Sequence, residues 1–333
     1  MRPTICVYIF ALSYHETGAT MKSIPLGKSG INVSTLGFGA MYLGTRTNAE
    51  TSFQLLDEYV AAGGNFIDTA NIYSHWIQGF KGGESETLIG EWLRQRGNRD
   101  QVIIASKVGF PYQDVKQELS PKTIAQECDR SLKRMGIDTM DVYYAHVDDY
   151  NTPLEETLEA FNKLVTAGKV RHIAASNYRA WRLEQAHGIS AANGWAEFCC
   201  VQQRHTYLRV KPGGSTKPQV ASNEDLFDYA RFHQFPIVAY SILLGGAYTK
   251  NIIHPEYAGA DTDARLAMLN TIAAETGATI NQIVIAWMLH SDYPVIPLIA
   301  ASSHEQLAEN LGALEINLSS DQMARLDAAK GGE

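Results

Sequence analysis

Six short apolar segments of this sequence end on polar side chains that can exchange protons or bind polar ligands. These residues are Asp68, Lys107, His146, Ser176 with Asn177, Gln202, and Tyr240 with Ser241. Each one alone has an ordinary structural explanation, since Asp68 could cap a helix and His146 could be a hydrogen-bonded core histidine. Six such coincidences are much harder to explain. If the segments are parallel strands of a barrel, their carboxyl ends meet at one face, where a shared site would lie.

The elements that would position these residues alternate along the chain. We predict strands over residues 36–41, 65–70, 102–108, 140–146, 170–176, 198–204, 236–241 and 295–300. Apolar residues at three- to four-residue spacing predict helices over 49–62, 85–96, 121–135, 154–167, 180–192, 223–233, 265–276 and 304–314, with a last helix over 319–329. This alternation implies parallel strands joined by crossovers, hence an α/β fold.

The number of units favours a barrel. Eight strand–helix units in about 280 residues fit a closed (β/α)8 TIM barrel, for which roughly 250 residues is typical. We predict a β-hairpin over residues 24–34 before the barrel and an extra helix at its carboxyl-terminal end. An open doubly wound sheet is the rival fold. The Gly37-Phe38-Gly39 sequence does not support a Rossmann fold, because the third glycine of that fingerprint is replaced by Tyr42.

Composition narrows the class of protein. The 333 residues include 28 basic and 36 acidic side chains, a net charge of −8. That balance argues against a nucleic-acid binder and against binding to an anionic membrane surface. The four cysteines show no spacing typical of a metal site, so we expect no metal and a reduced, cytoplasmic protein.

The chain shows no internal linker, and only its first residues stand apart. We predict one domain over residues 23–333, preceded by a disordered extension over residues 1–22. The apolar run over residues 5–12 is too short for a membrane span. It is either the core of a weak signal peptide or a stretch upstream of a native start at Met21.

Several motifs give the sequence a resemblance to a known family. They are LGFGAM (36–41), NFIDTANIY (65–73), GESETLIGEWL (83–93), IIASKVG (103–109), DVYYAH (141–146), AASNY (174–178), VQ (201–202), YS (240–241) and QLAEN (306–310). From about residue 24 to residue 330 the chain resembles the aldo-keto reductases. The resemblance implies a barrel enzyme that uses a nicotinamide cofactor without a Rossmann fold. It also implies a catalytic tetrad of Asp68, Tyr73, Lys107 and His146.

The chemistry of these four residues suits carbonyl reduction. The alkoxide left by hydride transfer needs a proton, and a free tyrosine, with a pKa of about 10, is a poor proton relay near neutral pH. An ammonium about 4 Å away favours the tyrosinate by about 4 kcal/mol, so we expect Lys107 to lower the pKa of Tyr73. Asp68 would anchor Lys107 and partly offset this shift. His146 would donate a hydrogen bond to the substrate carbonyl, and the hydride must come from a nicotinamide cofactor.

The same resemblance implies a cofactor site. Ser176, Asn177 and Gln202 would hold the carboxamide, and Tyr240 would stack on the nicotinamide ring. The full predicted set is Gly39, Met41, Asp68, Ser176, Asn177, Gln202, Tyr240, Ser241, Leu243, Gly245, Lys250, Ala301, Ser302, Gln306 and Asn310.

One departure from the family pattern concerns the choice of cofactor. NADPH-using relatives place a lysine or arginine near Ser303, but residues 297–310 contain neither. A 2′-phosphate there would lack a charge-assisted contact. We favour NADPH from the family resemblance and keep NADH as the alternative.

Residues on neighbouring loops predict the substrate side of the site. Tyr42, Trp76, Phe110 and His205 would line the substrate pocket. Such a lining suits a sugar or a small aromatic carbonyl equally well. We therefore expect a small-molecule carbonyl substrate, with the protein acting as a monomer or homo-oligomer.

Three other functions compete with reduction. A Schiff-base aldolase would use Lys107 as its nucleophile, but it leaves the polar ends at 176–177 and 240–241 unexplained. A metal-dependent hydrolase would have only His146 with Asp148 and Asp149 as a hint of ligands. A cofactor-binding regulatory subunit similar to potassium-channel β subunits shares the fold, and an intact tetrad argues for catalysis without excluding it.

Overall fold

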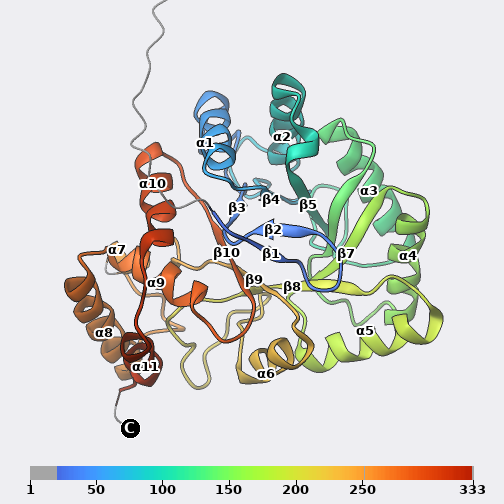
Figure 1. Ribbon diagram of the computed structural model, residues 1–333. Coiled ribbons are helices and arrows are strands. Elements are labelled where there is room, and N and C mark those ends of the chain that lie inside the picture. Colours follow the sequence, from blue (N-terminus) through green and yellow to red (C-terminus); the bar gives the residue numbers. More distant parts are fainter. Residues whose placement is uncertain (1–20, 251, 332–333) are drawn as a thin grey trace, which may run out of the picture.

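Eight parallel strands close into a barrel in the computed structural model of the chain, which describes residues 21–250 and 252–331. The strands are β3 (Gly37–Gly39), β4 (Phe66–Asp68), β5 (Ile103–Val108), β6 (Met140–Ala145), β7 (Val170–Ser176), β8 (Phe198–Arg204), β9 (Ile237–Tyr240) and β10 (Val295–Ile299). Each pairs with its neighbours in chain order, and β10 closes the barrel against β3 (Figure 1). All eight lie within the predicted segments, so the predicted TIM barrel is confirmed and the open sheet is wrong.

Helices form the outer layer of the barrel (Figure 1). They are α1 (Ala49–Ala61), α2 (Glu84–Arg96), α3 (Pro121–Met135), α4 (Leu154–Thr166), α5 (Ala180–Asn193), α6 (Glu224–His233), α7 (Ala247–Lys250), α8 (Ala260–Thr276), α9 (Ile280–Leu289), α10 (His304–Gly312) and α11 (Ser320–Ala328), with short 3-10 turns at Arg99–Gln101 and Ala313–Glu315. Local sequence sets their ends. In α3, Ser120 accepts a hydrogen bond from the Thr123 amide, Pro121 takes the first turn, and Gly136 ends the helix in a left-handed conformation.

Three helices between β9 and β10 depart from the prediction. Helix α9 was not predicted, because Ile280–Leu289 is apolar on nearly every side and shows no helical alternation. Its capping box, in which Thr279 and Gln282 exchange hydrogen bonds, is the sequence feature that could have identified it. The short α7 was also missed, and α8 begins at Ala260 rather than at residue 265.

The predicted hairpin closes the amino-terminal end of the barrel. Strands β1 (Ser23–Pro25) and β2 (Asn32–Ser34) pair antiparallel and lie across that end (Figure 1). Gly27 in the turn has a φ of +57°, and a Cβ placed on it would lie 2.2 Å from the Cys199 carbonyl oxygen. Only glycine allows the turn to approach the start of β8 so closely. The hairpin and the barrel share one apolar cluster that includes Leu26, Val33 and Phe66.

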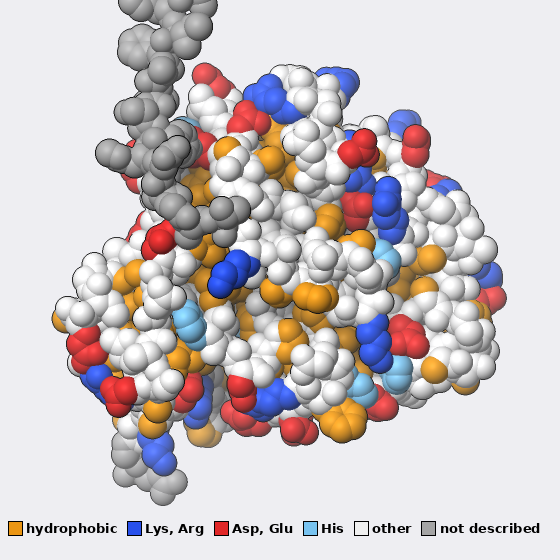
Figure 2. All heavy atoms as spheres, viewed as in Figure 1, with side chains coloured by type: hydrophobic (Ala, Val, Ile, Leu, Met, Phe, Trp, Pro, Cys, Tyr) orange, Lys and Arg blue, Asp and Glu red, His pale blue; other side chains and the backbone are white. Residues whose placement is uncertain are grey.

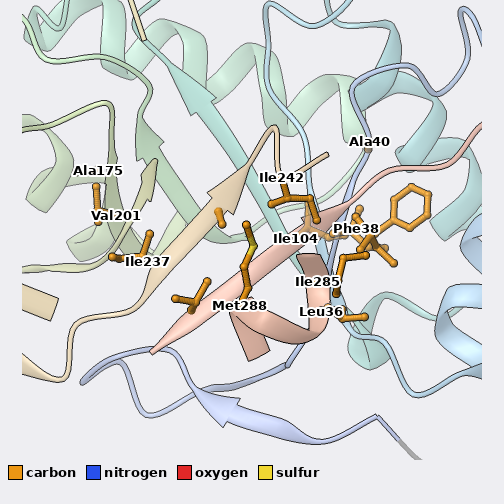
Figure 3. Packing of buried hydrophobic residues seen from close by; sticks show 14 of the residues in the cluster. Leu36, Phe38, Ala40, Ile104, Ala175, Val201, Ile237, Ile242, Ile285 and Met288 are labelled. Carbon is orange, nitrogen blue, oxygen red and sulfur yellow. The ribbon is translucent and has the colours of Figure 1, made fainter. Parts of the chain in front are cut away.

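A second apolar layer lies between the strands and the helices. It contains side chains from the strands and from α9, among them Ile237, Val201, Ile285 and Met288 (Figure 3). Because this layer fills the outer faces of the strands, the polar residues at the strand ends are left for the barrel axis and its open rim.

The surface seen from the hairpin side has few charges at its centre. Figure 2 shows acidic and basic side chains mainly around the rim, while apolar and uncharged atoms cover the middle.

Among the described residues, no single helix has the length and hydropathy of a membrane span. Helices α8 and α9 together would have the length and composition of one, but the chain bends by 94° between them. The predicted extension lies outside the described residues, except for Met21 and Lys22.

Candidate active site

A buried lysine forms the centre of the site. The Lys107 side chain is fully buried, and its Nζ donates hydrogen bonds to Asp68 Oδ1 at 2.5 Å, to the Thr69 carbonyl oxygen at 2.7 Å and to Tyr73 Oη at 2.8 Å. Three donated hydrogen bonds account for all three protons of an ammonium group. The contacts therefore describe Lys107 as a charged group held by a carboxylate, a carbonyl and a phenol.

The strands bring these residues together from distant parts of the chain. Asp68 ends β4 and pairs with Ala105 of β5, so Lys107, two residues further along β5, projects from the same face of that strand. Gln202 Nε2, on β8, donates to Asp68 Oδ2 at 2.7 Å. Both oxygens of the carboxylate are thus occupied, which fixes Asp68 between Lys107 and the far side of the barrel.

The electrostatics of Tyr73 correct one prediction. Lys107 does lie beside the phenol, but burial, together with the negative charge of Asp68, raises the pKa of Tyr73 well above its ordinary value. The expected lowering is wrong, because desolvation and the neighbouring carboxylate outweigh the effect expected of Lys107. Tyr73 is therefore a phenol that retains its proton. Its Oη lies 3.5 Å from Asp68 Oδ1.

Burial also shifts the pKa values of Asp68 and Lys107, the ion pair that contacts Tyr73. Loss of solvent raises the pKa of Asp68 and lowers that of Lys107, and the attraction between their charges opposes both shifts. This mutual dependence means that neither charge could be kept at this depth without the other.

His146 completes the predicted tetrad just after β6. Its ring lies 6.1 Å from the Tyr73 ring and 4.7 Å from the Phe110 ring, between centroids. Burial, reinforced by the positive charge of Lys107, lowers the pKa of His146 well below its usual range, so the imidazole is neutral. Its Nδ1 atom is buried without a hydrogen-bond partner among the described residues.

Residues predicted to hold the nicotinamide form a hydrogen-bonded group at the ends of β7 and β9. Asn177 has a φ of +58°, a conformation that asparagine tolerates better than most residues. Its Nδ2 donates to the His146 carbonyl oxygen at 2.9 Å and to Ser176 Oγ at 3.1 Å. Its Oδ1 accepts from Tyr240 Oη at 2.7 Å, which fixes the half-buried Tyr240 ring at the barrel rim.

The residues predicted to bind the cofactor close to the tetrad continue on the loops after β3 and β9. A Cβ at Gly39, beside Asp68 in the β3–β4 pair, would make ordinary van der Waals contact, the nearest atom being the Ile299 carbonyl oxygen at 3.5 Å. The half-buried Met41 follows β3 in the same loop. The half-buried Ser241 and Leu243 follow Tyr240.

The remaining predicted cofactor residues lie near α7 and after β10, and all of them except the buried Asn310 are exposed or half-buried. Gly245 and Lys250 are exposed, the latter at the end of α7. After β10, the exposed Gln306 accepts hydrogen bonds from the Ser302 amide and hydroxyl at 2.8 and 2.9 Å. The half-buried Ala301 precedes Ser302, and Asn310 donates to the Ala300 carbonyl oxygen at 3.1 Å.

Aromatic side chains gather on one side of the tetrad. The Trp76 ring, 44% exposed, lies 6.3 Å from the Tyr73 ring, and His75 lies 5.3 Å from Trp76, between centroids. With Phe110 beside His146, these rings form what we call the aromatic wall: Tyr73, His75, Trp76 and Phe110. The half-buried Tyr42 follows β3, with the Arg46 guanidinium over its ring.

His205 is a correction to the predicted substrate pocket. Because Gln202 faces the barrel axis, the alternation of side chains directs Gln203 and His205 outward, toward the helices. The His205 ring packs against Phe227 and Trp287, and its Nε2 lies 3.3 Å from Tyr293 Oη. It lines a separate cavity of about 790 Å³ between the outer elements.

Two backbone groups of the site, a carbonyl and an amide, were not indicated by the sequence. The Thr69 carbonyl oxygen accepts from Lys107, and the Val220 amide donates to Asn177 Oδ1 at 3.0 Å. Every residue has such groups, so composition gives no sign of them. Among residues 21–250 and 252–331, no group of three or more His, Cys, Asp or Glu side chains could hold a metal ion.

Known proteins are similar to this chain over most of its length. The profile of the Aldo/keto reductase family matches residues 35–330. The Bacillus subtilis protein named uncharacterized oxidoreductase YrpG is 30% identical over 319 residues, covering 91% of this chain and 94% of its own.

Two fungal enzymes are also similar. Norsolorinic acid reductase stcV of Emericella nidulans is 28% identical and covers 90% of this chain and 79% of its own. Aryl-alcohol dehydrogenase [NADP(+)] of Phanerodontia chrysosporium is 27% identical, with coverages of 90% and 83%.

Proposed function

Because the chain belongs to the aldo/keto reductase family, we propose that it reduces an aldehyde or ketone to the alcohol with a nicotinamide cofactor. The contact between Lys107 Nζ and Tyr73 Oη, at 2.8 Å, carries this proposal. It joins a phenol that retains its proton to a cation able to stabilise the phenolate left after proton transfer.

The residues of the tetrad then have distinct roles. Tyr73 donates its proton to the carbonyl oxygen as negative charge develops there. Lys107 stabilises the resulting phenolate, and Asp68 holds Lys107 in its charged form through the 2.5 Å contact. His146, as a neutral imidazole, donates a hydrogen bond that orients the substrate oxygen. When bound, the nicotinamide cofactor supplies the hydride.

The cofactor would be held by the group at the ends of β7, β8 and β9. Ser176, Asn177 and Gln202 would bind the carboxamide, and Tyr240 would offer its ring to the nicotinamide. We propose NADPH, which agrees with the name of the fungal aryl-alcohol dehydrogenase. NADH is the alternative because residues 297–310 contain no lysine or arginine.

The aromatic wall favours an aryl carbonyl as substrate. Offset and edge-on ring contacts each contribute about 0.5–1.5 kcal/mol beyond the burial of apolar surface. Such rings orient a planar aromatic substrate through contacts with their faces and edges. One of the similar fungal proteins is named for an aryl alcohol, which agrees with this choice.

A turnover and binding screen tests the proposal. Purified protein is mixed with NADPH or NADH and with aryl aldehydes, aryl ketones, aliphatic aldehydes or sugars, and cofactor oxidation is followed by absorbance. We expect turnover with NADPH and the highest kcat/KM for an aryl carbonyl. Cofactor affinity is measured separately by quenching of protein fluorescence. Failure to bind either cofactor contradicts the proposal, while binding without turnover of any carbonyl favours a regulatory cofactor-binding protein.

A further inference from the structure

A buried polar network lies outside the barrel, behind strand β5, which carries Lys107, and the segment after β4, which carries Tyr73. Its two carboxylates, Glu86 on α2 and Glu127 on α3, are at most 1% exposed. The roles proposed above for the tetrad do not use this network. Buried carboxylates are costly unless their oxygens are hydrogen-bonded, and both oxygens of each of these two carboxylates accept hydrogen bonds.

Glu86 is bound to the strand that carries Lys107. Its Oε1 accepts a hydrogen bond from Ser106 Oγ at 2.5 Å, and its Oε2 accepts from Arg134 Nε at 2.5 Å. Ser106 is the residue directly before Lys107 in β5. Because side chains alternate along a strand, Ser106 faces the helices while Lys107 faces the barrel axis.

Glu127 is bound to the loop that carries Tyr73. Its Oε2 accepts from Asn71 Nδ2 at 2.7 Å and from Tyr112 Oη at 2.5 Å. Its Oε1 accepts from Arg130 at 2.8 Å. Asn71 lies two residues before Tyr73, in the short segment after β4, and it is fully buried. The Asn71 amide therefore holds this segment to α3.

Arg134 joins the two halves of the network. Besides its contact with Glu86, it donates a hydrogen bond from Nη1 to Tyr112 Oη at 3.4 Å. The loop before α2 packs closely on it: Gly83 has a φ of +92°, and a Cβ there would lie 2.6 Å from Arg134 Cδ. The chain of contacts runs from Ser106 through Glu86, Arg134, Tyr112 and Glu127 to Asn71.

We propose that Glu86 and Glu127 are positioning residues, which hold Lys107 and Tyr73 at their mutual contact through Ser106 and Asn71. The proposal rests on the proposed function, because it concerns the reaction assigned to that pair. Glu86 also has an electrostatic role. Its negative charge, after that of Asp68, opposes the effect of burial on Lys107 and so raises the pKa of the lysine.

Substitution of Glu86 tests both roles. The Glu86→Gln variant keeps the shape of the side chain but removes its charge. We expect kcat to fall about tenfold or more, since misplacement of reacting groups by 1 Å can cost roughly 100-fold. The KM for the carbonyl and the Kd for the cofactor should stay unchanged. The alkaline limb of the kcat profile should move to lower pH, because Lys107 loses its proton more easily.

Two further variants separate position from charge. Ser106→Ala removes the hydrogen bond but keeps the Glu86 charge, so kcat should fall without a shift of the pH profile. Glu127→Gln should lower kcat and likewise leave the profile in place. Glu91→Gln, at an exposed glutamate on the same helix α2, is the matched control and should change nothing.

The outcomes distinguish this proposal from the proposed function. A wild-type protein without turnover contradicts the function itself. A wild-type protein with turnover, but with Glu86→Gln equal to Glu91→Gln in kcat and pH profile, overturns the positioning role. If Glu86→Gln does not fold, as judged by circular dichroism, Ser106→Ala decides the matter, and an unchanged kcat in that variant overturns the proposal.

Discussion

The two ends of the barrel interior differ in chemistry. At the amino-terminal end, the hairpin and the strands share an apolar cluster, with Leu26 and Phe66 fully buried. At the carboxyl-terminal end, Lys107 and Asp68 are equally buried but charged. Tyr144, whose ring lies 5.7 Å from Lys107 Nζ, belongs to the apolar cluster and marks the boundary.

This difference separates stability from reactivity. Burial of apolar side chains contributes free energy of folding in proportion to the area removed from water, whereas a buried ion pair contributes little or opposes folding. The closed end therefore stabilises a site that adds little stability of its own. Changes at the charged end should alter turnover first, and changes at the apolar end should alter stability first.

The largest expected effect is at the charged end. In Tyr73→Phe, reduction should fall by about 10²- to 10⁴-fold because the proton donor is lost. The affinity for the cofactor and the midpoint of thermal unfolding should remain close to those of the wild type. Steady-state kinetics and fluorescence titration measure the two properties. Retained turnover would show that Tyr73 is not the acid.

The corresponding change at the apolar end should have the opposite pattern. Leu26→Ala removes a fully buried side chain, and the free energy of unfolding should fall by about 2–5 kcal/mol. The kcat of the folded fraction should not change. Urea denaturation measures the loss, with Lys28→Ala, in the exposed turn, expected within about 0.5 kcal/mol of the wild type. A lower kcat in Leu26→Ala at unchanged stability would contradict the assignment of stability to the apolar end and of turnover to the charged end.

A buried histidine outside the site, His205, makes the free energy of unfolding depend on pH. Burial lowers the pKa of His205 to about 4, against about 6.5 in an unfolded chain. Between these values the unfolded chain takes up a proton that the folded chain does not. Acidification from pH 6.5 to 4 should therefore lower the free energy of unfolding by about 3 kcal/mol through His205, with no effect above pH 6.5. The lowered pKa of His146 acts in the same direction.

Urea denaturation at several pH values measures this loss. The His205→Phe variant should show a smaller loss between pH 6.5 and 4 than the wild type, with the same turnover per folded molecule. Equal slopes in the two proteins would mean that His205 is already protonated in the folded state.

The smallest expected effect concerns the loop after β10. Ser303→Arg should strengthen NADPH binding relative to NADH by up to about tenfold, through a charge-assisted contact with the 2′-phosphate. Ser303 caps α10 by accepting from the Gln306 amide, so the same change should lower stability by about 1 kcal/mol. Ser302→Arg places the charge next to it and keeps this cap. An unchanged ratio of dissociation constants in both variants would contradict the role of this loop.

The strands and the tetrad contacts were predictable from sequence because their signals are local. A buried parallel strand is a continuous apolar run, and a polar residue such as Lys107 at its end is conspicuous. The spacing of Asp68 and Tyr73 placed both on one strand end and its loop. The structure brings these residues together as predicted, with Gln202 added from the opposite side of the barrel.

What could not be predicted depends on environment rather than on pattern. The rise in the pKa of Tyr73 follows from burial, which one pairwise interaction does not capture. The outward direction of His205 follows from the exact end of β8, and element ends are the least certain part of a pattern. Helix α9 lies in an apolar environment on nearly all sides, so it lacks the alternation by which helices are recognised.

The tight turn at Gly27 has a kinetic consequence. The hairpin, pressed against the start of β8, lies across the amino-terminal end of the barrel, so the opposite rim is the entrance that a substrate and a cofactor would share. Two reactants that share one entrance cannot exchange independently: the one bound deeper must arrive first and depart last. By closing one end of the barrel, the turn at Gly27 thus favours a compulsory order of binding at the other.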